Sequence, residues 1–325
     1  MDKDKYALDQ HINNNSPIIF GCMGLGGTWD NTPISTGDIS LAHDVVDAAI
    51  DCGITLFDHA DIYTKGKAEQ VFGEVLKQRP TLREQIAIQS KCAIRFDDEL
   101  GPKRYDSSPK WIIDSVENSL TRLNIEQLDV LMLHRPDPLM EPELIAQTFN
   151  SLQTSGKVKN FGVSNMQVHQ LTYLQKYLAQ PLVVNQVELS LKHLAWLEEG
   201  VTSGNSGEPV VNYGAGTIEY CRAHNVQLQS WGSLCQGLFT GRDISSEPVN
   251  IQKTAQLVET LAAEYQTSKE AIILAWLMHH PANIQPIIGT TKIDRIKACV
   301  QAQKVSLTNG HWYQLWVTAR GHELP

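Results

Sequence analysis

Residues 129–134 read Asp-Val-Leu-Met-Leu-His, a short apolar run with a polar residue at each end. The four residues 130–133 are apolar in succession, so both faces of an extended segment here would be hydrophobic. Continuous apolar runs of this length are typical of parallel strands that are buried on both faces. The run therefore predicts a strand that lies between an inner core and an outer layer of helices.

Seven similar runs occur along the chain, at residues 18–23, 55–60, 86–92, 160–164, 182–189, 227–231 and 284–289. Helical patterns lie between them, such as residues 38–51, which end before Gly53, and a run that opens at Ser108-Pro109. This alternation is typical of βαβ units. Eight strands fit a closed α/β barrel, the (β/α)8 or TIM barrel, better than an open sheet. We expect one domain over residues 1–325.

The composition of the 325 residues excludes several classes of protein. The net charge of −9 argues against nucleic acid and against anionic lipid as partners, because both require a basic surface. The six cysteines are scattered without a C-x-x-C pair, which favours reduced thiols over disulfides or zinc. The polar N-terminus does not resemble a secretory signal, and no apolar run approaches 18 residues. We expect a cytoplasmic protein without a membrane span.

Two stretches resemble insertions after the sixth and seventh predicted strands. Residues 200–209 are rich in Gly, Ser, Asn and Glu, and residues 236–252 contain Gly237, Gly241 and Pro248. In a barrel, the loops at the carboxyl ends of the strands build the active site. Residues 236–252 are therefore a candidate lid, and whether they close over a ligand stays open.

Titratable residues follow three of the predicted strands at their carboxyl ends. The second strand leads through Asp58 to Tyr63, the third ends at Lys91, and the fourth ends at His134. A lysine that closes an apolar strand is desolvated and needs a carboxylate, for which Asp58 is the natural partner. A cation held beside Tyr63 would lower the pKa of the phenol towards neutrality. Such a tyrosine can donate a proton, with His134 as a hydrogen-bond donor to a carbonyl oxygen.

In this order and spacing, FDHADIY (57–63), QSK (89–91), LMLHRPD (131–137), GVSN (162–165) and NQVELS (185–190) resemble the aldo-keto reductase family. The resemblance extends from residue 18 to about residue 301 and is closest to the bacterial oxidoreductase branch related to potassium-channel β-subunits. It implies a catalytic tetrad of Asp58, Tyr63, Lys91 and His134. It also implies NADPH-dependent reduction of small-molecule aldehydes or ketones to alcohols by a monomer.

The resemblance also implies a cofactor site. Ser164, Asn165 and Gln186 match residues that bind the nicotinamide carboxamide, and Trp231 matches an aromatic residue that stacks on the nicotinamide ring. Three further segments match cofactor-binding residues of the family. They are the first-strand turn (Gly21, Cys22 and Met23), a pyrophosphate-binding segment (Gly232, Ser233 and Leu234) and a 2′-phosphate site (Gly289, Thr290, Thr291, Lys292 and Arg295). Asp58 is also predicted to contact the cofactor.

The choice between NADPH and NADH rests on the last of these segments. Thr290, Thr291 and Lys292 would lie at a helix N-terminus, which favours anions, with Arg295 one turn further on. Gly289 stands where many family members have a phosphate-binding lysine, and Ala298 and Cys299 replace residues that often contact adenine. We expect NADPH, and NADH stays open.

Several other patterns have structural explanations. The segment GCMGLGG (21–27) does not match G-x-G-x-x-G in register. Adjacent histidines at 279 and 280, or His59 with Asp61, lack a third ligand at a useful spacing, so no metal is expected. Trp29 and Trp196 each fall in a loop after a strand, and we expect Trp29 to line the substrate pocket together with Tyr63 and His134.

Two other functions are compatible with the sequence. One is a regulatory subunit that binds NADP(H) and turns over slowly, as the channel β-subunit branch suggests. The other is a barrel hydrolase or lyase that uses Asp58, Asp61 and Lys91, which leaves Ser164, Asn165 and Arg295 unexplained.

Overall fold

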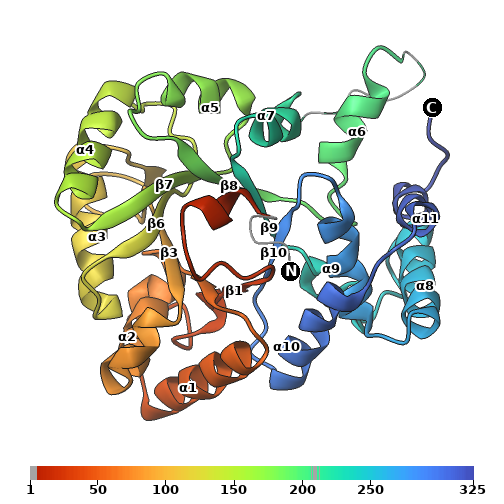
Figure 1. The fold of residues 1–325 in the computed structure, drawn as a ribbon, viewed down its shortest axis with the longest axis horizontal. Helices are drawn as coiled ribbons and strands as arrows, with labels where there is room; N and C mark the ends of the chain where they lie inside the picture. The colour runs from red at the N-terminus through yellow and green to blue at the C-terminus, as the bar shows by residue number, and fades with distance from the viewer. Residues whose placement is uncertain (1–5, 206, 208–210, 212) are drawn as a thin grey trace.

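The computed structural model describes residues 6–205, 207, 211 and 213–325. Eight parallel strands close into a barrel in the order β1-β10-β9-β8-β7-β6-β3-β2, with helices around its outside (Figure 1). The predicted (β/α)8 barrel is confirmed. The barrel strands are β1 (Ile19–Gly21), β2 (Leu56–Asp58), β3 (Ala87–Cys92), β6 (Leu128–Leu133), β7 (Val158–Ser164), β8 (Leu182–Glu188), β9 (Gln227–Trp231) and β10 (Gln285–Ile288).

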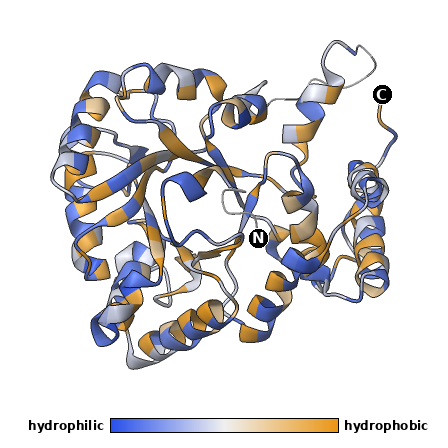
Figure 2. Cartoon of the chain, in the orientation of Figure 1, coloured by the Kyte–Doolittle hydropathy of each residue, from blue (hydrophilic) through white to orange (hydrophobic). Residues whose placement is uncertain are grey.

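The helices surround the barrel and run mostly between successive strands. They are α1 (Thr36–Asp51), α2 (Lys67–Gln78), α3 (Pro109–Leu123), α4 (Pro142–Thr154), α5 (Val168–Gln175), α6 (Ala195–Thr202), α7 (Thr217–Ala223), α8 (Val249–Glu264), α9 (Lys269–His279), α10 (Ile293–Val300) and α11 (Asn309–Arg320). Hydrophobic and hydrophilic residues alternate in bands along them (Figure 2), as expected for helices with one face on the barrel. No described helix combines the length and apolar character needed to cross a bilayer.

The β6 strand shows why the apolar run at residues 130–133 is buried on both faces. Successive side chains of a strand point to opposite sides. Val130 and Met132 belong to a core inside the barrel, whereas Leu131 and Leu133 belong to the core between the barrel and the helices. Leu8 and Ile12, from the N-terminal segment that contains η1 (Ala7–Gln10), belong to the inner core as well. The interior of the barrel near the amino-terminal ends of the strands is therefore filled with apolar side chains.

The structure differs from the predicted extents of the first strand and of the two insertions. The first strand is shorter than predicted, because the 3-10 turn η2 (Cys22–Gly24) takes over after Gly21. Both predicted insertions are partly helical: residues 200–202 belong to α6, and residues 249–252 belong to α8. Residues 206, 208 and 209 of the first insertion lie outside the described residues. Helix caps explain the starts of α1 and α3, where Ser35 and Ser108 accept backbone hydrogen bonds.

Candidate active site at the carboxyl ends of the strands

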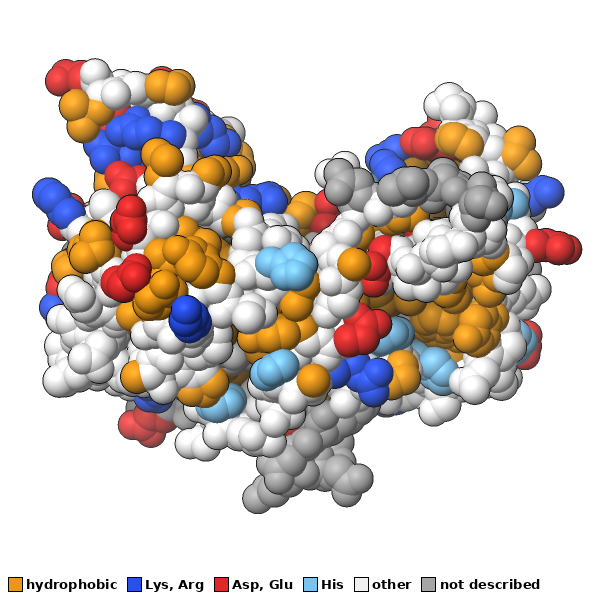
Figure 3. Space-filling model, turned by 90° about the horizontal axis from the view of Figure 1, so that it is seen from above, with side chains coloured by type: hydrophobic (Ala, Val, Ile, Leu, Met, Phe, Trp, Pro, Cys, Tyr) orange, Lys and Arg blue, Asp and Glu red, His pale blue; other side chains and the backbone are white. Residues whose placement is uncertain are grey.

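A cavity of about 620 Å³ lies at the carboxyl ends of the barrel strands. Turned by 90° from the view of Figure 1, the molecule has two raised lobes with a hollow between them (Figure 3). The cavity is lined by residues that follow most of the barrel strands, as expected for the site-bearing face of this architecture. Those predicted from sequence are Gly21, Met23, Trp29, Asp58, Tyr63, His134, Ser164, Asn165, Gln186, Trp231, Gly232 and Gly289.

Lys91 lies at the centre of a buried network beneath this cavity. Its ammonium nitrogen lies 2.8 and 2.7 Å from the two carboxylate oxygens of Asp58. It also donates to the backbone carbonyl of His59 at 2.9 Å and lies 3.0 Å from the phenol oxygen of Tyr63. The Lys91 side chain is fully buried and that of Asp58 is 3% exposed. The predicted partners of Lys91 are therefore in contact with it.

Two glutamines also bind the Asp58 carboxylate. Gln89 and Gln186 each donate to its Oδ1 oxygen, at 2.7 and 2.9 Å. Gln89 also exchanges two hydrogen bonds with Gln229 across the barrel interior. A buried ion pair is stable only when its remaining hydrogen-bonding capacity is satisfied. Gln89 and Gln229 were not singled out from the sequence. The signal that could have identified them is a glutamine within an otherwise apolar strand.

The charge states of Lys91 and Tyr63 follow from burial and from each other. Burial lowers the pKa of Lys91, but Asp58 and Tyr63 together outweigh it and the pKa is raised overall, so the side chain is cationic. Burial raises the pKa of Tyr63, and Lys91 opposes this only in part. The expectation that Lys91 brings the pKa of Tyr63 towards neutrality is therefore wrong for the protein without ligands. The phenol keeps its proton at neutral pH.

The backbone after Tyr63 is strained. Tyr63 begins the turn η3 (Tyr63–Gly66), in which Thr64 and Lys65 have φ of 46° and 59°. The left-handed region is unfavourable for a β-branched residue such as Thr64. The Thr64 hydroxyl is held by the backbone carbonyl of Leu25 at 3.0 Å, which offsets part of this cost. Strain of this kind is found where the surrounding structure fixes a functional side chain.

His134 faces Tyr63 across the cavity. Their ring centroids lie 6.1 Å apart with the planes at 79°. Burial, followed by the charges of Lys91, Arg135 and Lys103, lowers the pKa of His134 to about 2. The imidazole is therefore neutral and can donate one N–H. Its Nδ1 atom is buried and has no hydrogen-bond partner among the described residues.

The residues predicted to bind the nicotinamide carboxamide line the cavity but are bonded to one another. The Asn165 amide donates to the Ser164 hydroxyl at 2.7 Å and accepts from the Trp231 indole N–H at 3.0 Å. The Ser164 hydroxyl donates to the backbone carbonyl of Gln186 at 2.8 Å. These bonds fix the Trp231 ring at the cavity wall.

The predicted phosphate-binding residues line an adjoining cavity of about 430 Å³ between the ends of β9 and β10. Lys292 is the N-cap of α10, as predicted. Arg295 pairs with Glu270 at 3.1 Å and bonds to the Thr240 hydroxyl, which belongs to the candidate lid. The predicted members of this set are Gly232, Ser233, Leu234, Gly289, Thr290, Thr291, Lys292 and Arg295.

Two of the residues predicted for the site, Cys22 and Trp196, differ in placement. The Cys22 side chain is fully buried in the core, unlike Gly21 and Met23. Trp196 was expected in a loop near the pocket, but it lies in α6, is 3% exposed, and packs edge-on against Trp276. Because α6 begins sooner after β8 than the sequence indicated, Trp196 lines two other cavities instead. One of them shares Arg135, Asn165 and Trp231 with the main cavity. Trp29, by contrast, lines the main cavity as expected and is 49% exposed.

Several lining residues were missed. Arg135 directly follows His134, and Lys103 and Tyr105 belong to the hairpin of β4 (Ile94–Arg95) and β5 (Arg104–Tyr105). The position of Arg135 at a strand end is the one signal that sequence reasoning could have used. The hairpin residues carry no such signal, because their approach to the cavity depends on how the hairpin folds over it.

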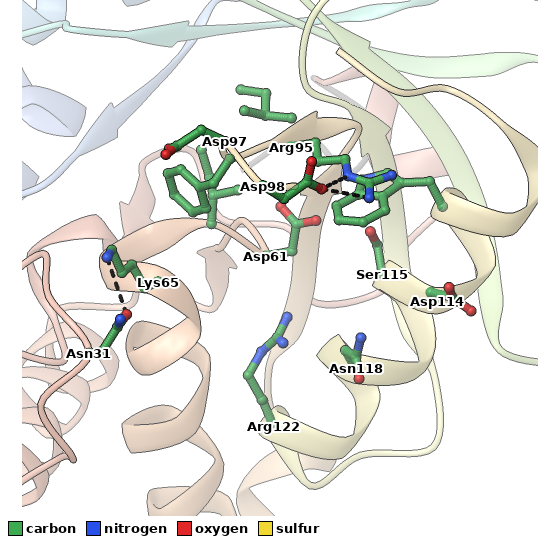
Figure 4. A pocket seen from close by; sticks show the side chains of 14 residues that line it. Asn31, Asp61, Lys65, Arg95, Asp97, Asp98, Asp114, Ser115, Asn118 and Arg122 are labelled. Atoms are coloured by element: carbon green, nitrogen blue, oxygen red, sulfur yellow. Dashed lines mark hydrogen bonds and ion pairs between the residues drawn. The ribbon is translucent and has the colours of Figure 1, made fainter. Parts of the chain in front are cut away.

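A second cavity lies beside the first and shares Ile62 and Ile94 with it. Figure 4 shows the Asp61 carboxyl group in this cavity, near Ser115 and Arg122. The Oδ1 atom of Asp61 is buried without a hydrogen-bond partner among the described residues. Burial and the nearby Glu69 raise the pKa of Asp61 to about 7.

The fold and the site define a class of protein: a parallel (β/α)8 barrel with a buried lysine and carboxylate beside a phenol at its carboxyl-end mouth. The aldo/keto reductase family model matches residues 17–315, and the chain belongs to this family.

Characterised and uncharacterised relatives agree with this assignment. The chain is 35% identical to the uncharacterised oxidoreductase YcsN of Bacillus subtilis, over 92% of this chain and 94% of that protein. It is 31% identical to the 6-dehydroglucose reductase of Agrobacterium fabrum, over 95% of this chain and 96% of that protein.

Solved structures share the fold. The glycerol dehydrogenase of Gluconobacter oxydans matches with a TM-score of 0.76 and 23% identity, over 94% of this chain and 92% of that one. An aldo/keto reductase of Klebsiella pneumoniae, solved with NADP and acetate, matches with a TM-score of 0.68 and 20% identity, over 95% and 92%.

Proposed function

We propose that this protein reduces aldehyde or ketone carbonyls to alcohols with NADPH, and that Tyr63 donates the proton. The observation that carries the proposal is the 3.0 Å contact between Lys91 and the phenol oxygen of Tyr63, in a cavity that also holds His134. A neutral phenol beside a permanent cation is a proton donor whose conjugate base is stabilised as the proton leaves.

The cavities fit a dinucleotide. A Cβ at Gly289 would meet only the carbonyl oxygen of Gly21 at 4.0 Å, so the backbone at this point is open to a ligand. Trp231 is held in place by Asn165 at one end of the groove, and the α10 N-terminus with Arg295 supplies anion-binding groups at the other. This arrangement supports nicotinamide at Trp231 and a phosphate at Lys292 and Arg295. When bound, reduced nicotinamide supplies the hydride.

Side chains of the protein orient and protonate the carbonyl oxygen of the substrate. The His134 imidazole, neutral because it is buried beside cations, orients this oxygen by a hydrogen bond. Tyr63 transfers its hydroxyl proton to the oxygen as negative charge develops there. Lys91 stabilises the resulting phenolate, and Asp58 keeps Lys91 charged and in place. The phenol then regains a proton from solvent.

The test compares NADPH oxidation by the wild-type protein and Tyr63→Phe, with a panel of small aldehydes that includes sugar aldehydes, since one relative is named a 6-dehydroglucose reductase. We expect Tyr63→Phe to lower kcat by about 10²- to 10⁴-fold and to retain NADPH binding, measured by quenching of tryptophan fluorescence. Tyr313→Phe, which alters an exposed phenol on α11, is the matched control.

Equal turnover by wild type and Tyr63→Phe would exclude Tyr63 as the proton donor. Tight NADPH binding with negligible turnover across the panel would favour the regulatory subunit instead.

A further inference from the structure

The main cavity carries cations that the proposed proton transfer does not use. Lys103, Arg135 and Lys192 line it, whereas its carboxylates are Asp58 and Glu188. Asp58 is neutralised by Lys91, and Glu188 lies 2.9 Å from His193. The cavity is therefore locally positive in a chain whose net charge is −9. A local field opposite to the net charge concentrates ligands of the complementary sign.

Two of these cations lie on the side of His134. Arg135 follows His134 in the chain, and Lys103 and Arg135 both contribute to the electrostatic environment of its imidazole. In the closed barrel, β3 and β6 lie side by side, and Lys103 and Arg135 follow these strands. The phosphate-binding candidates follow β9 and β10, on another part of the circle. Lys192 is different, because it interacts with Cys235 next to the cofactor groove.

Within the part of the chain that the structure describes, neither cation forms an ion pair. No described carboxylate lies within 4.0 Å of the charged nitrogens of Lys103 or Arg135, although neighbouring cations are paired. On the same hairpin, Arg104 pairs with Asp98 at 3.0 Å, and Arg95 pairs with Asp98 and Asp106. The two arginines of the hairpin therefore form ion pairs with nearby carboxylates, whereas Lys103 lines the cavity without such a partner among the described residues.

Arg135 is also held in position. Its guanidinium lies 5.7 Å from the centroid of the Trp231 ring, within range of a cation–π contact. The residue is half-buried, so a ligand in the cavity would interact with it in a partly desolvated environment. A guanidinium oriented in this way can form two parallel hydrogen bonds with a carboxylate or a phosphate.

We propose that Arg135 and Lys103 form an anion-recognition site at the substrate end of the cavity, and that the preferred substrate is a carbonyl compound that carries a carboxylate or a phosphate. This inference rests on the proposed carbonyl reduction and specifies the substrate class of the same site. Arg135 and Lys103 are specificity-determining residues that bind the distal anionic group, while Tyr63 and His134 act on the carbonyl oxygen.

The test uses pairs of aldehydes that differ in charge. For carboxylates, the pair is 4-carboxybenzaldehyde and methyl 4-formylbenzoate; for phosphates, it is glyceraldehyde 3-phosphate and glyceraldehyde. We expect the wild-type kcat/KM to be higher for the charged member of at least one pair, mainly through a lower KM. The KM of that member should rise with ionic strength, because salt screens exposed charges. The pair that shows the preference identifies the anionic group.

Arg135→Gln should lower the charged-to-neutral ratio of kcat/KM by about 10- to 100-fold, the range expected for a charge-assisted hydrogen bond. The ratio is used because Arg135 also contacts Trp231. A general effect of the substitution on the site would change kcat/KM equally for both substrates and would cancel in the ratio. Arg135→Lys should recover part of the preference, and Lys103→Gln should lower the ratio by a smaller factor, because Lys103 is exposed. Lys253→Gln removes one exposed cation from α8 and is the matched control.

Absence of a charge preference in both pairs, or an equal loss for both members in Arg135→Gln, would overturn the anion site. In either case reduction of the neutral aldehydes would leave the proposed reductase function intact. Failure of that function has a different signature, because no member of either pair would then oxidise NADPH.

Discussion

The Lys91 ammonium lies 3.0 Å from the Tyr63 phenol oxygen, although the two residues are 28 positions apart in the chain. The contact depends on two neighbouring strands, β2 and β3, whose carboxyl ends lie at the same rim of the barrel. Asp58 and the His59 carbonyl hold the ammonium from the other side. The position of the cation is thus set by the barrel and not by the flexible lysine side chain.

Replacing Lys91 by Met should damage both stability and activity. The substitution keeps most of the side-chain volume but leaves the Asp58 carboxylate buried without its cation. Loss of one partner of a buried ion pair costs about 3–5 kcal/mol. We expect that loss in the free energy of unfolding by urea denaturation, together with a decrease in kcat of at least about 10²-fold.

The double variant Lys91→Met with Asp58→Asn is the control for this prediction. It removes the unpaired charge, so it should recover part of the stability while the activity stays low. A single Lys91→Met variant as stable as wild type would contradict the buried pair.

Asp61 should make stability depend on pH in a particular direction. Its pKa is raised from 3.8 to about 7 in the folded protein, mainly by burial. Between these values the folded state holds a proton that the unfolded state has lost, so this group lowers stability as the pH rises from 4 to 7. Asp61→Asn should therefore be more stable than wild type above pH 7, by up to about 4 kcal/mol, with the difference vanishing near pH 4.

Urea unfolding of both proteins at several pH values measures this difference directly. Asp97→Asn, at an exposed carboxylate that lines the same cavity, is the matched control. If the stability difference between Asp61→Asn and wild type did not change with pH, the Asp61 carboxyl group would be solvated like an ordinary surface residue.

Arg295→Gln should distinguish the two nicotinamide cofactors. The guanidinium lies beside the predicted phosphate-binding turn and is oriented by Glu270 and Thr240. Removal of a charge-assisted bond to a 2′-phosphate should raise the Kd for NADPH by about 10- to 100-fold. The Kd for NADH, which lacks this phosphate, should change by only about two- to threefold.

Fluorescence titration with both cofactors measures these constants. Arg242→Gln, in the loop that contains Thr240 but paired with Glu247, is the control variant. An equal increase in the Kd for NADPH and for NADH would contradict a contact between Arg295 and the 2′-phosphate. The phosphate would then bind elsewhere, or the protein would not discriminate between the two cofactors.

Gly73→Ala should destabilise the packing of α2 against α3. A Cβ at this position would lie 2.0 Å from the Arg122 carbonyl oxygen, so one helix must move. Overpacking of this kind costs about 1–3 kcal/mol, even though alanine favours the helix itself. The midpoint of urea unfolding should fall accordingly.

Gly37→Ala provides the opposite case. Gly37 lies in the exposed first turn of α1, where the nearest atom to a new Cβ is the Ser35 hydroxyl at 3.6 Å. This variant should be stabilised by about 0.5–1 kcal/mol. Destabilisation of both variants to the same extent would contradict the close approach at Gly73.

The barrel and the order of its chemical groups could be predicted from the sequence because both are local patterns. Residues 130–133 form an uninterrupted apolar run, as a strand that is buried on both faces requires. Helix α3 begins after the N-cap Ser108, with Pro109 in its first turn, as the sequence Ser-Pro indicates. The fold then brings all carboxyl ends of parallel strands to one face, so residues at strand ends converge without further information. Tyr63, Lys91 and His134 could be grouped for this reason.

Other features depend on contacts between segments that are distant in the sequence. The net direction of the Tyr63 pKa depends on how far burial outweighs the nearby cation, and burial is a property of the packed molecule. Whether Trp196 faces a pocket depends on where α6 packs, and the hairpin that carries Lys103 reaches the cavity only through its tertiary placement.

The sequence by itself determined the barrel, the family and the residues at the strand ends, because these follow from periodicity and from motifs along the chain. Only the tertiary structure decided which charges are neutralised. An ion pair forms where two side chains meet in space, and this is why Lys91 is paired with Asp58, while Arg135 and Lys103 line the cavity without a carboxylate partner among the described residues.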